Sequence, residues 1–244
     1  MNTLLRLAGI AGISLLTACT PPSGPGEIND PFEARNREVH EANKQLDRTF
    51  MRPGSQRYGR AVPKPVRAGI ENFSDNLSLP GMVVNSVLQL RLDDAAWNAG
   101  RFLFNSTIGL AGVFDPASDI GITERKTDFG ETLHVWGFRE GAYLELPVLG
   151  PSTERDAIGK VVDIALNPIG SVLTYPEAEI AAAAGIAARV GDRYDHSELI
   201  DSILYDSADS YAQARILYLQ NRRFELGGSE EPDYYDPYED PYGE

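Results

Sequence analysis

Residues 82–114 read MVVNSVLQLRLDDAAWNAGRFLFNSTIGLAGVF, and this apolar stretch decides the fold class. Asp93 and Asp94 divide it into two predicted helices, and around Arg101-Phe102-Leu103-Phe104 little polar face remains. A helical stripe of this width is either packed in a core or laid in the interface of a bilayer, and the residues alone leave both interpretations open. The candidate membrane-facing side chains are Trp97, Phe102, Phe104 and Phe114.

Two further helices are predicted on the N-terminal side of this stretch. Asp30-Pro31-Phe32-Glu33 has the residues of a capping box, with proline at the first helical position, and apolar residues then recur to about Phe50. Arg52-Pro53-Gly54 is expected to end that helix. A second amphipathic helix is predicted from Val66 to Leu77, and Pro80-Gly81 is expected to break it.

The C-terminal side adds one irregular segment and several helices. Residues 132–146 alternate weakly around glycines, which indicates a short hairpin or an extended loop. Pro151 and the residues after it open a helix, with Thr153 and Asp156 as a capping pair, and Pro168 ends it. Three helices are then predicted at 176–190, 196–205 and 207–226. The fold class is therefore all-α, with one glycine-rich insert.

A short leader precedes this body. Arg6 supplies a positive charge, residues 7–16 are mostly apolar, and Leu16-Thr17-Ala18-Cys19 resembles a bacterial lipobox. The stretch is too short to span a bilayer, so we interpret residues 1–18 as a lipoprotein signal peptide and Cys19 as the lipidated first residue of the mature protein. Residues 19–29 would then form a lipidated tether, and residues 30–226 a helical domain.

The composition sets limits on partners and location. The formal net charge is −14, and residues 229–244 supply half of it, with seven acidic residues and no basic one. An acidic chain argues against nucleic acid as a partner, because phosphates require basic surfaces. Residues 227–244 are rich in proline, tyrosine and acid, so we expect a disordered tail. The alternative, a strip that docks a basic partner, is less favoured.

The sequence offers no constellation for catalysis or metal binding. His40, His134 and His196 are the only histidines, and none has a second histidine at ligand spacing. Asp93 and Asp94 are adjacent, so on a helix they do not share a face. Neither a nucleophile elbow nor a phosphate-binding loop is present. We expect no enzyme activity, no cofactor and no metal.

Asp128-Phe129-Gly130-Glu131-Thr132-Leu133 and the run from Leu146 to Asp156 are the most specific of several short blocks spread over residues 29–226. Together these blocks resemble the MlaA (VacJ) family of outer-membrane lipoproteins. Weaker matches include Asn29-Asp30-Pro31-Phe32-Glu33, Arg101-Phe102 with Asn105-Ser106-Thr107-Ile108-Gly109, and Tyr218-Leu219-Gln220 with Arg222-Arg223. His40 and Ala42 stand where the family usually has aromatic residues.

The resemblance implies a ring-shaped bundle of amphipathic helices in the inner leaflet of the outer membrane, with a polar central channel. Phospholipids that have strayed into the outer leaflet would pass through it to a periplasmic, MlaC-like carrier, which preserves lipid asymmetry. A trimeric porin is a possible partner. The alternative function is that of a scaffolding lipoprotein that anchors another envelope protein.

The glycine-rich run between residues 130 and 150 is the candidate for the channel mouth. Irregular backbone at membrane depth is tolerated around a water-filled cavity, and glycine allows unusual dihedral angles. The candidate gate residues are the charged side chains that flank this run, namely Asp128, Glu131, Arg155 and Asp156. The alternative is that Arg155 and Asp156 only cap a helix.

Overall fold

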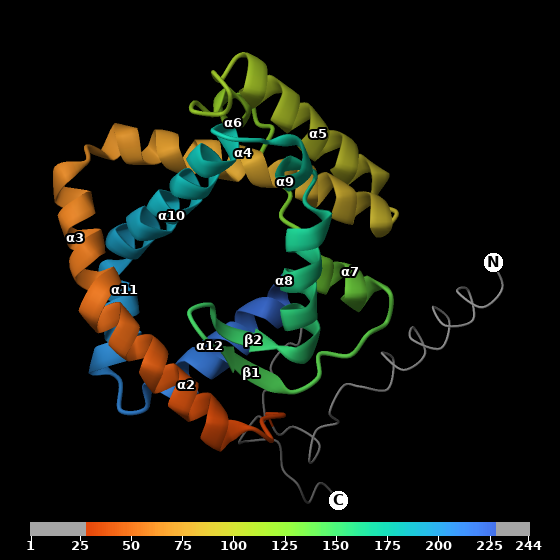
Figure 1. Ribbon diagram of the computed structural model, residues 1–244. Coiled ribbons are helices and arrows are strands. Elements are labelled where there is room, and N and C mark those ends of the chain that lie inside the picture. The colour runs from red at the N-terminus through yellow and green to blue at the C-terminus, as the bar shows by residue number, and fades with distance from the viewer. Residues whose placement is uncertain (1–27, 228–244) are drawn as a thin grey trace, which may run out of the picture.

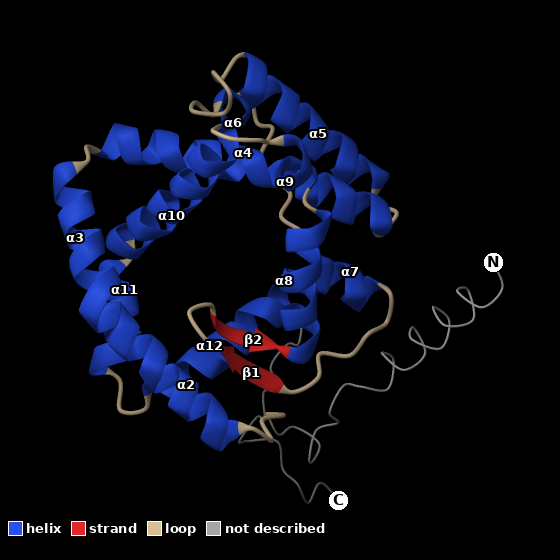
Figure 2. Ribbon diagram, viewed as in Figure 1, coloured by secondary structure: helices blue, strands red, loops and turns tan. Residues whose placement is uncertain are grey.

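A computed structural model describes residues 28–227, and their helices follow one another around a ring (Figure 1). Outside these residues lie the expected leader and lipidation site, most of the tether and nearly all of the acidic tail. The ring is built almost entirely from helices, with one small hairpin on its lower side (Figure 2). The all-α class with a ring shape is therefore confirmed.

One side of the ring is a nearly continuous helical rod. It comprises α2 (Glu33–Leu46), a π-helical turn (Asp47–Met51) and α3 (Arg52–Ala61). The predicted end at Arg52-Pro53-Gly54 was wrong. Pro53 lies at the second position of α3, directly after the π-helical turn, and the helical path continues through it.

The predicted capping box of α2 was also wrong. Phe32 is the N-cap residue, and no side chain caps the helix. The Asp30 carboxylate instead accepts hydrogen bonds from Asn36, at 2.9 Å, and from Tyr211 and Arg215 of the C-terminal helix. Asp30 therefore joins the two ends of the domain.

Helices α4 (Lys64–Leu88) and α5 (Leu92–Thr107) pack against each other along the upper side of the ring. Pro80 lies inside α4, so the predicted break at Pro80-Gly81 was wrong. Packing on α5 and on α10 (Glu177–Asp195) offsets the lost hydrogen bond. The division between α4 and α5 also differs from the predicted one. The chain turns at Leu90, with φ of 60°. Asp93 and Asp94 lie in the first turn of α5, where the positive end of the helix dipole stabilises their negative charges.

The glycine-rich segment contains more helix than predicted. After α6 (Pro116–Asp119), helix α7 (Phe129–Val135) occupies the start of the expected hairpin, because Asp128 caps it by accepting from Glu131 N at 2.8 Å. The hairpin lies further along the chain. Its strands β1 (Tyr143–Leu146) and β2 (Gly150–Thr153) pair antiparallel, with Tyr143 opposite Thr153.

The remaining helices close the ring. They are α8 (Glu154–Leu166), α9 (Pro168–Val172), α10 (Glu177–Asp195), α11 (Ser197–Asp201) with a π-helical turn (Ser202–Asp206), and α12 (Ser210–Glu225). The Thr153 side chain accepts from Asp156 N at 3.2 Å, which confirms the predicted capping pair. No helix within residues 28–227 has the length and hydropathy to cross a membrane.

Polar groups make up an unusual share of the buried interior. Tyr143, Tyr211 and Leu219 form an apolar cluster where β1 meets α12, and Tyr143 stacks edge-on to Tyr211 at 5.8 Å. Beyond it, most fully buried side chains are polar or charged, including Asn98 and Thr132. A ring has no thick central core, so hydrogen bonds and ion pairs do much of the joining between its helices.

Candidate functional site

Three of the four predicted gate residues meet in one cluster, in which Arg155 and Asp156 are buried and Asp128 is partly exposed. Arg222 of α12 donates to Asp128 at 2.6 Å and, through Nε, to Asp156 at 3.2 Å. Arg155 approaches the same Asp156 carboxylate at 3.3 Å, and Tyr218 donates to it at 2.8 Å. The cluster therefore joins the starts of α7 and α8 to the end of α12.

Local sequence places each of these groups. Asp128 and Thr153 are N-cap residues, so Asp128 and Asp156 both lie at positive helix ends, where carboxylates are stabilised. The two helices also approach very closely. A Cβ atom on Gly159 of α8 would lie 2.4 Å from the backbone nitrogen of Gly130 in α7, so only glycine fits at this crossing.

The charges in the cluster support one another. Burial alone would raise the pKa of Asp156, but Arg222 and Arg155 outweigh it and hold that pKa below its usual value. Burial, followed by the negative charge of Asp156 and then the hydrogen bond that Tyr218 donates to it, raises the pKa of the Tyr218 hydroxyl. Asp156 is therefore ionised, and Tyr218 neutral, at physiological pH.

Glu131, the fourth predicted gate residue, faces a different partner. Its carboxylate accepts from Arg91, in the link between α4 and α5, at 2.5 Å. Both Arg155 and Asp156 are almost completely buried, with 3% and 4% of their surface exposed. Helix α7 is thus held by Arg91 through Glu131 and by Arg222 through Asp128. Arg155 and Asp156 have little contact with solvent.

The predicted membrane-facing residues occupy different environments. Phe114 is exposed, whereas Phe102 and Phe104 are half-buried. Trp97 is also half-buried, and its indole N–H donates to the Thr123 carbonyl at 2.8 Å. The exposed apolar surface of α5 and the turn after it consists mainly of aliphatic residues that were not selected from the sequence, namely Leu92, Leu103, Ile108 and Leu110.

A charged pocket of about 590 Å³ lies between α4 and α10. Glu71, Asp75 and Asp192 contribute carboxylates to its lining, and Lys126 and Arg189 contribute positive charge. Burial and then neighbouring carboxylates raise the pKa of Glu71. The sequence did not reveal this pocket, because its residues come from three distant segments and none forms a local motif.

Metal binding finds no support in the described part of the chain. Among residues 28–227, no group of three histidine, cysteine, aspartate or glutamate side chains is placed to hold an ion. His40 is used structurally: its ring nitrogens lie 3.3 Å from Glu145 and 3.0 Å from Ser210. His40 is buried, and it thus links α2 to β1 and α12 through these contacts.

Comparison with known proteins gives concordant results. The family described as MlaA lipoprotein matches residues 28–225. The chain is 34% identical to the "Intermembrane phospholipid transport system lipoprotein MlaA" of Shigella flexneri over 93% of this chain and 90% of that protein. For the protein of the same name from Escherichia coli the identity is 33%, with the same coverage.

A solved structure has a similar fold. It was reported as "Structural basis for maintenance of bacterial outer membrane lipid asymmetry", and it matches with a TM-score of 0.67 and 28% sequence identity, over 81% of this chain and 98% of that chain. The family match and both relatives cover most of the helical domain. The chain therefore belongs to the MlaA lipoprotein family.

Proposed function

We propose that this protein is an outer-membrane lipoprotein that removes mislocalised phospholipids from the outer leaflet and passes them to a periplasmic carrier. It would do so without catalysis and thereby maintain lipid asymmetry. The observation that carries this proposal is the similarity, over nearly the whole chain, to a lipoprotein named for intermembrane phospholipid transport. The same ring-forming segments are covered by the family match.

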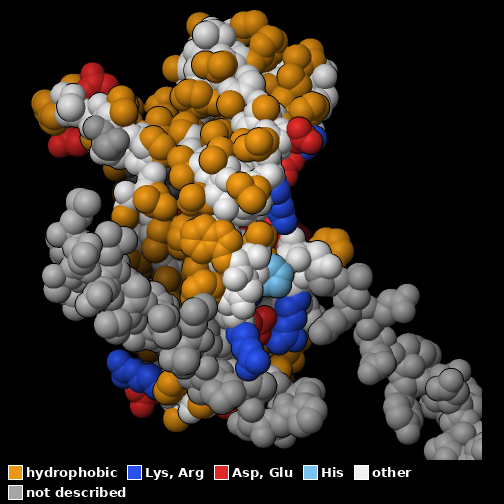
Figure 3. Space-filling view, turned by 90° about the vertical axis from the view of Figure 1, so that its right-hand side faces the viewer, with side chains coloured by type: hydrophobic (Ala, Val, Ile, Leu, Met, Phe, Trp, Pro, Cys, Tyr) orange, Lys and Arg blue, Asp and Glu red, His pale blue; other side chains and the backbone are white. Residues whose placement is uncertain are grey.

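The distribution of side chains supports residence in one leaflet. Leu103 and Leu110 are more than 60% exposed, and the neighbouring Phe114 is 58% exposed. Such side chains on an outer wall suit acyl chains better than water. Figure 3 shows one outer face, where hydrophobic side chains cover the upper part and basic side chains and a histidine gather below.

A passage for phospholipid must offer polar groups to the headgroup, because an unpaired polar group in hydrocarbon costs several kcal/mol. We assign this role to the charged pocket between α4 and α10, where carboxylates and cations lie together. The gate assignment of Asp128, Glu131, Arg155 and Asp156 stays a prediction. Their ion pairs, in which Arg155 and Asp156 are buried, favour a positioning role that holds α7, α8 and α12 together.

Anchoring is proposed to depend on Cys19. Several acyl chains, at about 0.8 kcal/mol per buried methylene, would hold the protein on the membrane almost permanently. Cys19→Ala should block lipidation and leave unprocessed precursor. Recovery of mature mutant protein with the outer membrane after a high-salt wash would contradict the acyl anchor.

The function is tested by deleting the gene and restoring it on a plasmid. Loss of the protein should increase outer-leaflet phospholipid and detergent sensitivity, and the wild-type gene should reverse both. Purified protein should bind two-chain phospholipids and release neither fatty acid nor headgroup, as judged by mass spectrometry. Protein-dependent hydrolysis would place the protein among enzymes.

The carrier and the porin are tested separately. A periplasmic MlaC-like protein should withdraw labelled phospholipid from the reconstituted protein, and a trimeric porin should copurify with it from outer membranes. A deletion strain with normal lipid asymmetry, together with capture of an envelope protein, would instead favour the scaffolding function.

A further inference from the structure

Two adjoining cavities differ sharply in character. An apolar cavity of about 750 Å³ lies between α7 and α8, and a second cavity of about 530 Å³ lies beside it. Phe138 and Arg155 line both. The apolar lining of the first includes Leu133, Trp136, Ile158, Val161 and Val162.

The second cavity is basic. Arg139, Arg155 and Arg223 line it together with His134, and Glu140 supplies the only carboxylate of its lining, which pairs with Arg223 at 3.0 Å. Burial, followed by the charge of Arg155, lowers the pKa of His134. Three arginines and one carboxylate line this cavity, so its charge favours an anion, although Asp156 next to Arg155 offsets part of that charge.

Arg155 has an unused hydrogen-bond donor where the cavities meet. Its Nε approaches Asp156 at 3.3 Å, and its Nη1 lies 3.4 Å from Nδ1 of His134. Its buried Nη2 finds no acceptor within the described part of the chain. A buried guanidinium N–H without a partner is costly, so an added acceptor at this point would be stabilising.

We propose that these two cavities form a binding site for one phospholipid on the outer wall of the ring, with an acyl chain in the apolar cavity and the phosphate in the basic one. The volume suits an organic ligand, since such pockets span about 300–1,000 Å³. Arginine is the residue best suited to phosphate. The site would fix the depth of the ring in the leaflet.

The apolar cavity requires an apolar occupant. Val161 is 68% exposed and Ile158 is 43% exposed, and both lie on the open side of α8. Trp136 is fixed beside them, because its indole N–H donates to the Leu88 carbonyl at 3.1 Å and its ring stacks edge-on to Phe129. A hydrocarbon chain with a phosphate at its end matches both linings, whereas a free phosphate matches only one.

The chain contains two tryptophans, so a Trp97→Phe variant leaves Trp136 as the single reporter. In this background, purified protein in non-ionic detergent is titrated with phosphatidylglycerol brominated on its acyl chains, because bromine quenches nearby indole fluorescence. We expect saturable quenching by this lipid. Brominated diacylglycerol, which lacks the phosphate, should bind about tenfold more weakly, the loss expected from a missing charge-assisted contact.

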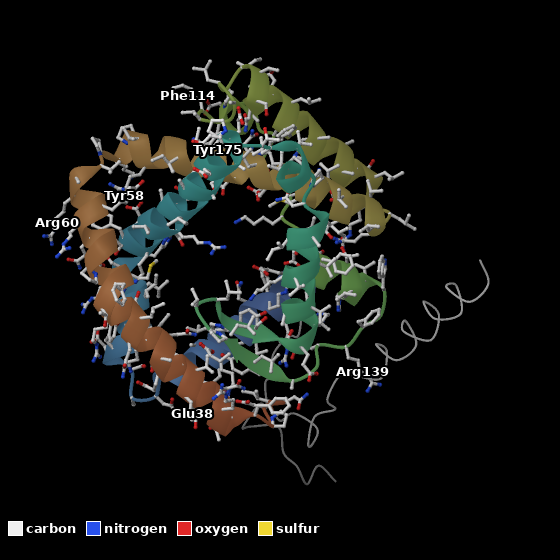
Figure 4. The ribbon with its side chains drawn as sticks, viewed as in Figure 1. Glu38, Tyr58, Arg60, Phe114, Arg139 and Tyr175 are labelled. Atoms are coloured by element: carbon white, nitrogen blue, oxygen red, sulfur yellow. The ribbon has the colours of Figure 1, made fainter. Side chains whose placement is uncertain are left out.

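Two substitutions at exposed positions test the two halves of the site. Val161→Glu should abolish quenching, and Arg139→Ala should weaken the apparent affinity about threefold to tenfold. The matched controls are Leu199→Glu on α11 and Arg60→Ala on the outer side of α3 (Figure 4), which should leave quenching unchanged. Melting temperature is measured for every variant, so that misfolding is recognised.

Unsaturable quenching, equal quenching by diacylglycerol, or full quenching in Val161→Glu would overturn the site. The inference rests on the proposed function only because phospholipid is taken as the ligand. The two proposals can fail separately. If the gene restores lipid asymmetry in the deletion strain but the purified protein shows no saturable quenching, only the wall site is disproved. If the purified protein shows saturable quenching but its gene does not restore asymmetry, only the proposed function is disproved.

Discussion

Arg222 and Asp156 are 66 residues apart in the chain, yet they form a buried ion pair with Nε–Oδ2 and Nη2–Oδ1 distances of 3.2 Å each. The same guanidinium also reaches Asp128 at 2.6 Å. One arginine thus holds the N-terminal ends of α7 and α8 against α12, the last helix of the ring. Because a ring lacks a thick core, such a contact has few neighbours that could replace it.

Arg222→Met is expected to destabilise the protein by about 3–5 kcal/mol, because it leaves the carboxylate of Asp156 buried with only Arg155 to offset its charge. Its neighbour Arg223 provides a matched control. That arginine is 41% exposed and pairs with Glu140, so Arg223→Met should cost at most about 1 kcal/mol. Urea unfolding of both variants checks the difference, and equal losses would mean that the cluster is not essential to the fold.

Asp156 also makes stability depend on pH. Its pKa is lower in the folded protein than in the unfolded chain, so the folded state is stabilised above the unfolded pKa of 3.8, and that stabilisation is lost as pH falls through the folded value. We expect Asp156→Asn to be less stable than wild type at pH 7. The difference in the free energy of unfolding between wild type and Asp156→Asn should become smaller below about pH 4.

Urea titrations at several pH values test this expectation. Other carboxylates also titrate in this range, so the comparison is between the two proteins and not within either one. If the free energies of unfolding of wild type and Asp156→Asn differ by the same amount from pH 7 to pH 3, the charge of the Asp156 carboxylate does not stabilise the fold.

The crossing of α7 and α8 depends on Gly159. An added methyl group would overlap the backbone of Gly130, which cannot move as a flexible side chain can. Gly159→Ala should therefore cost about 1–3 kcal/mol or more, the usual range for overpacking. Gly100→Ala is the control, because nothing lies within 4 Å of its Cβ position in α5. There alanine should stabilise the helix by up to about 1 kcal/mol.

Thermal unfolding separates these two glycines. We expect Gly159→Ala to lower the melting temperature and Gly100→Ala to raise it or leave it unchanged. Unchanged stability in Gly159→Ala would indicate that α7 and α8 can move apart without a loss of free energy. In that case the close crossing would not be what positions the cluster.

Sequence patterns predicted part of the local structure around this cluster, although not helix α7. Thr153 was recognised as a cap, and the charged residues around the glycine-rich run were selected because they flank it. The capping pair and Pro168 also located α8, and the three helices predicted after it correspond to α10, to α11 with its π-helical turn, and to α12. Element ends were less predictable, because the helical path continues through Pro53, and packing offsets the cost of Pro80.

Long-range partners could not be predicted. Nothing in the residues around Arg222 distinguishes it from Arg223, although one is buried in the cluster and the other is partly exposed. Gly159 lies outside the glycine-rich run, so its close approach to α7 left no local pattern. The charged pocket combines residues from α4, α10 and the 120–128 loop, and only the closed ring brings them together.

The two interpretations of the apolar stretch that the sequence left open, core packing and contact with a bilayer, can be tested at the surface of α5. Leu103 and Phe114 are exposed, which agrees with contact to lipid, whereas Phe102 is half-buried against the protein. In a variant that lacks residues 1–19, and therefore both the leader and the lipid, Leu103→Asn and Phe114→Asn should reduce flotation with phospholipid vesicles. Each should change the free energy of unfolding by no more than about 0.5 kcal/mol, as is usual at exposed sites.

Phe102→Asn is the contrasting variant, since it replaces a packed aromatic side chain on the same helix. It should lower the melting temperature, because the loss of buried apolar area weakens folding. The lipid-facing assignment requires that Leu103→Asn and Phe114→Asn weaken vesicle binding at normal melting temperature. If they instead lower the melting temperature and leave vesicle binding unchanged, this surface of α5 packs against protein and not against lipid.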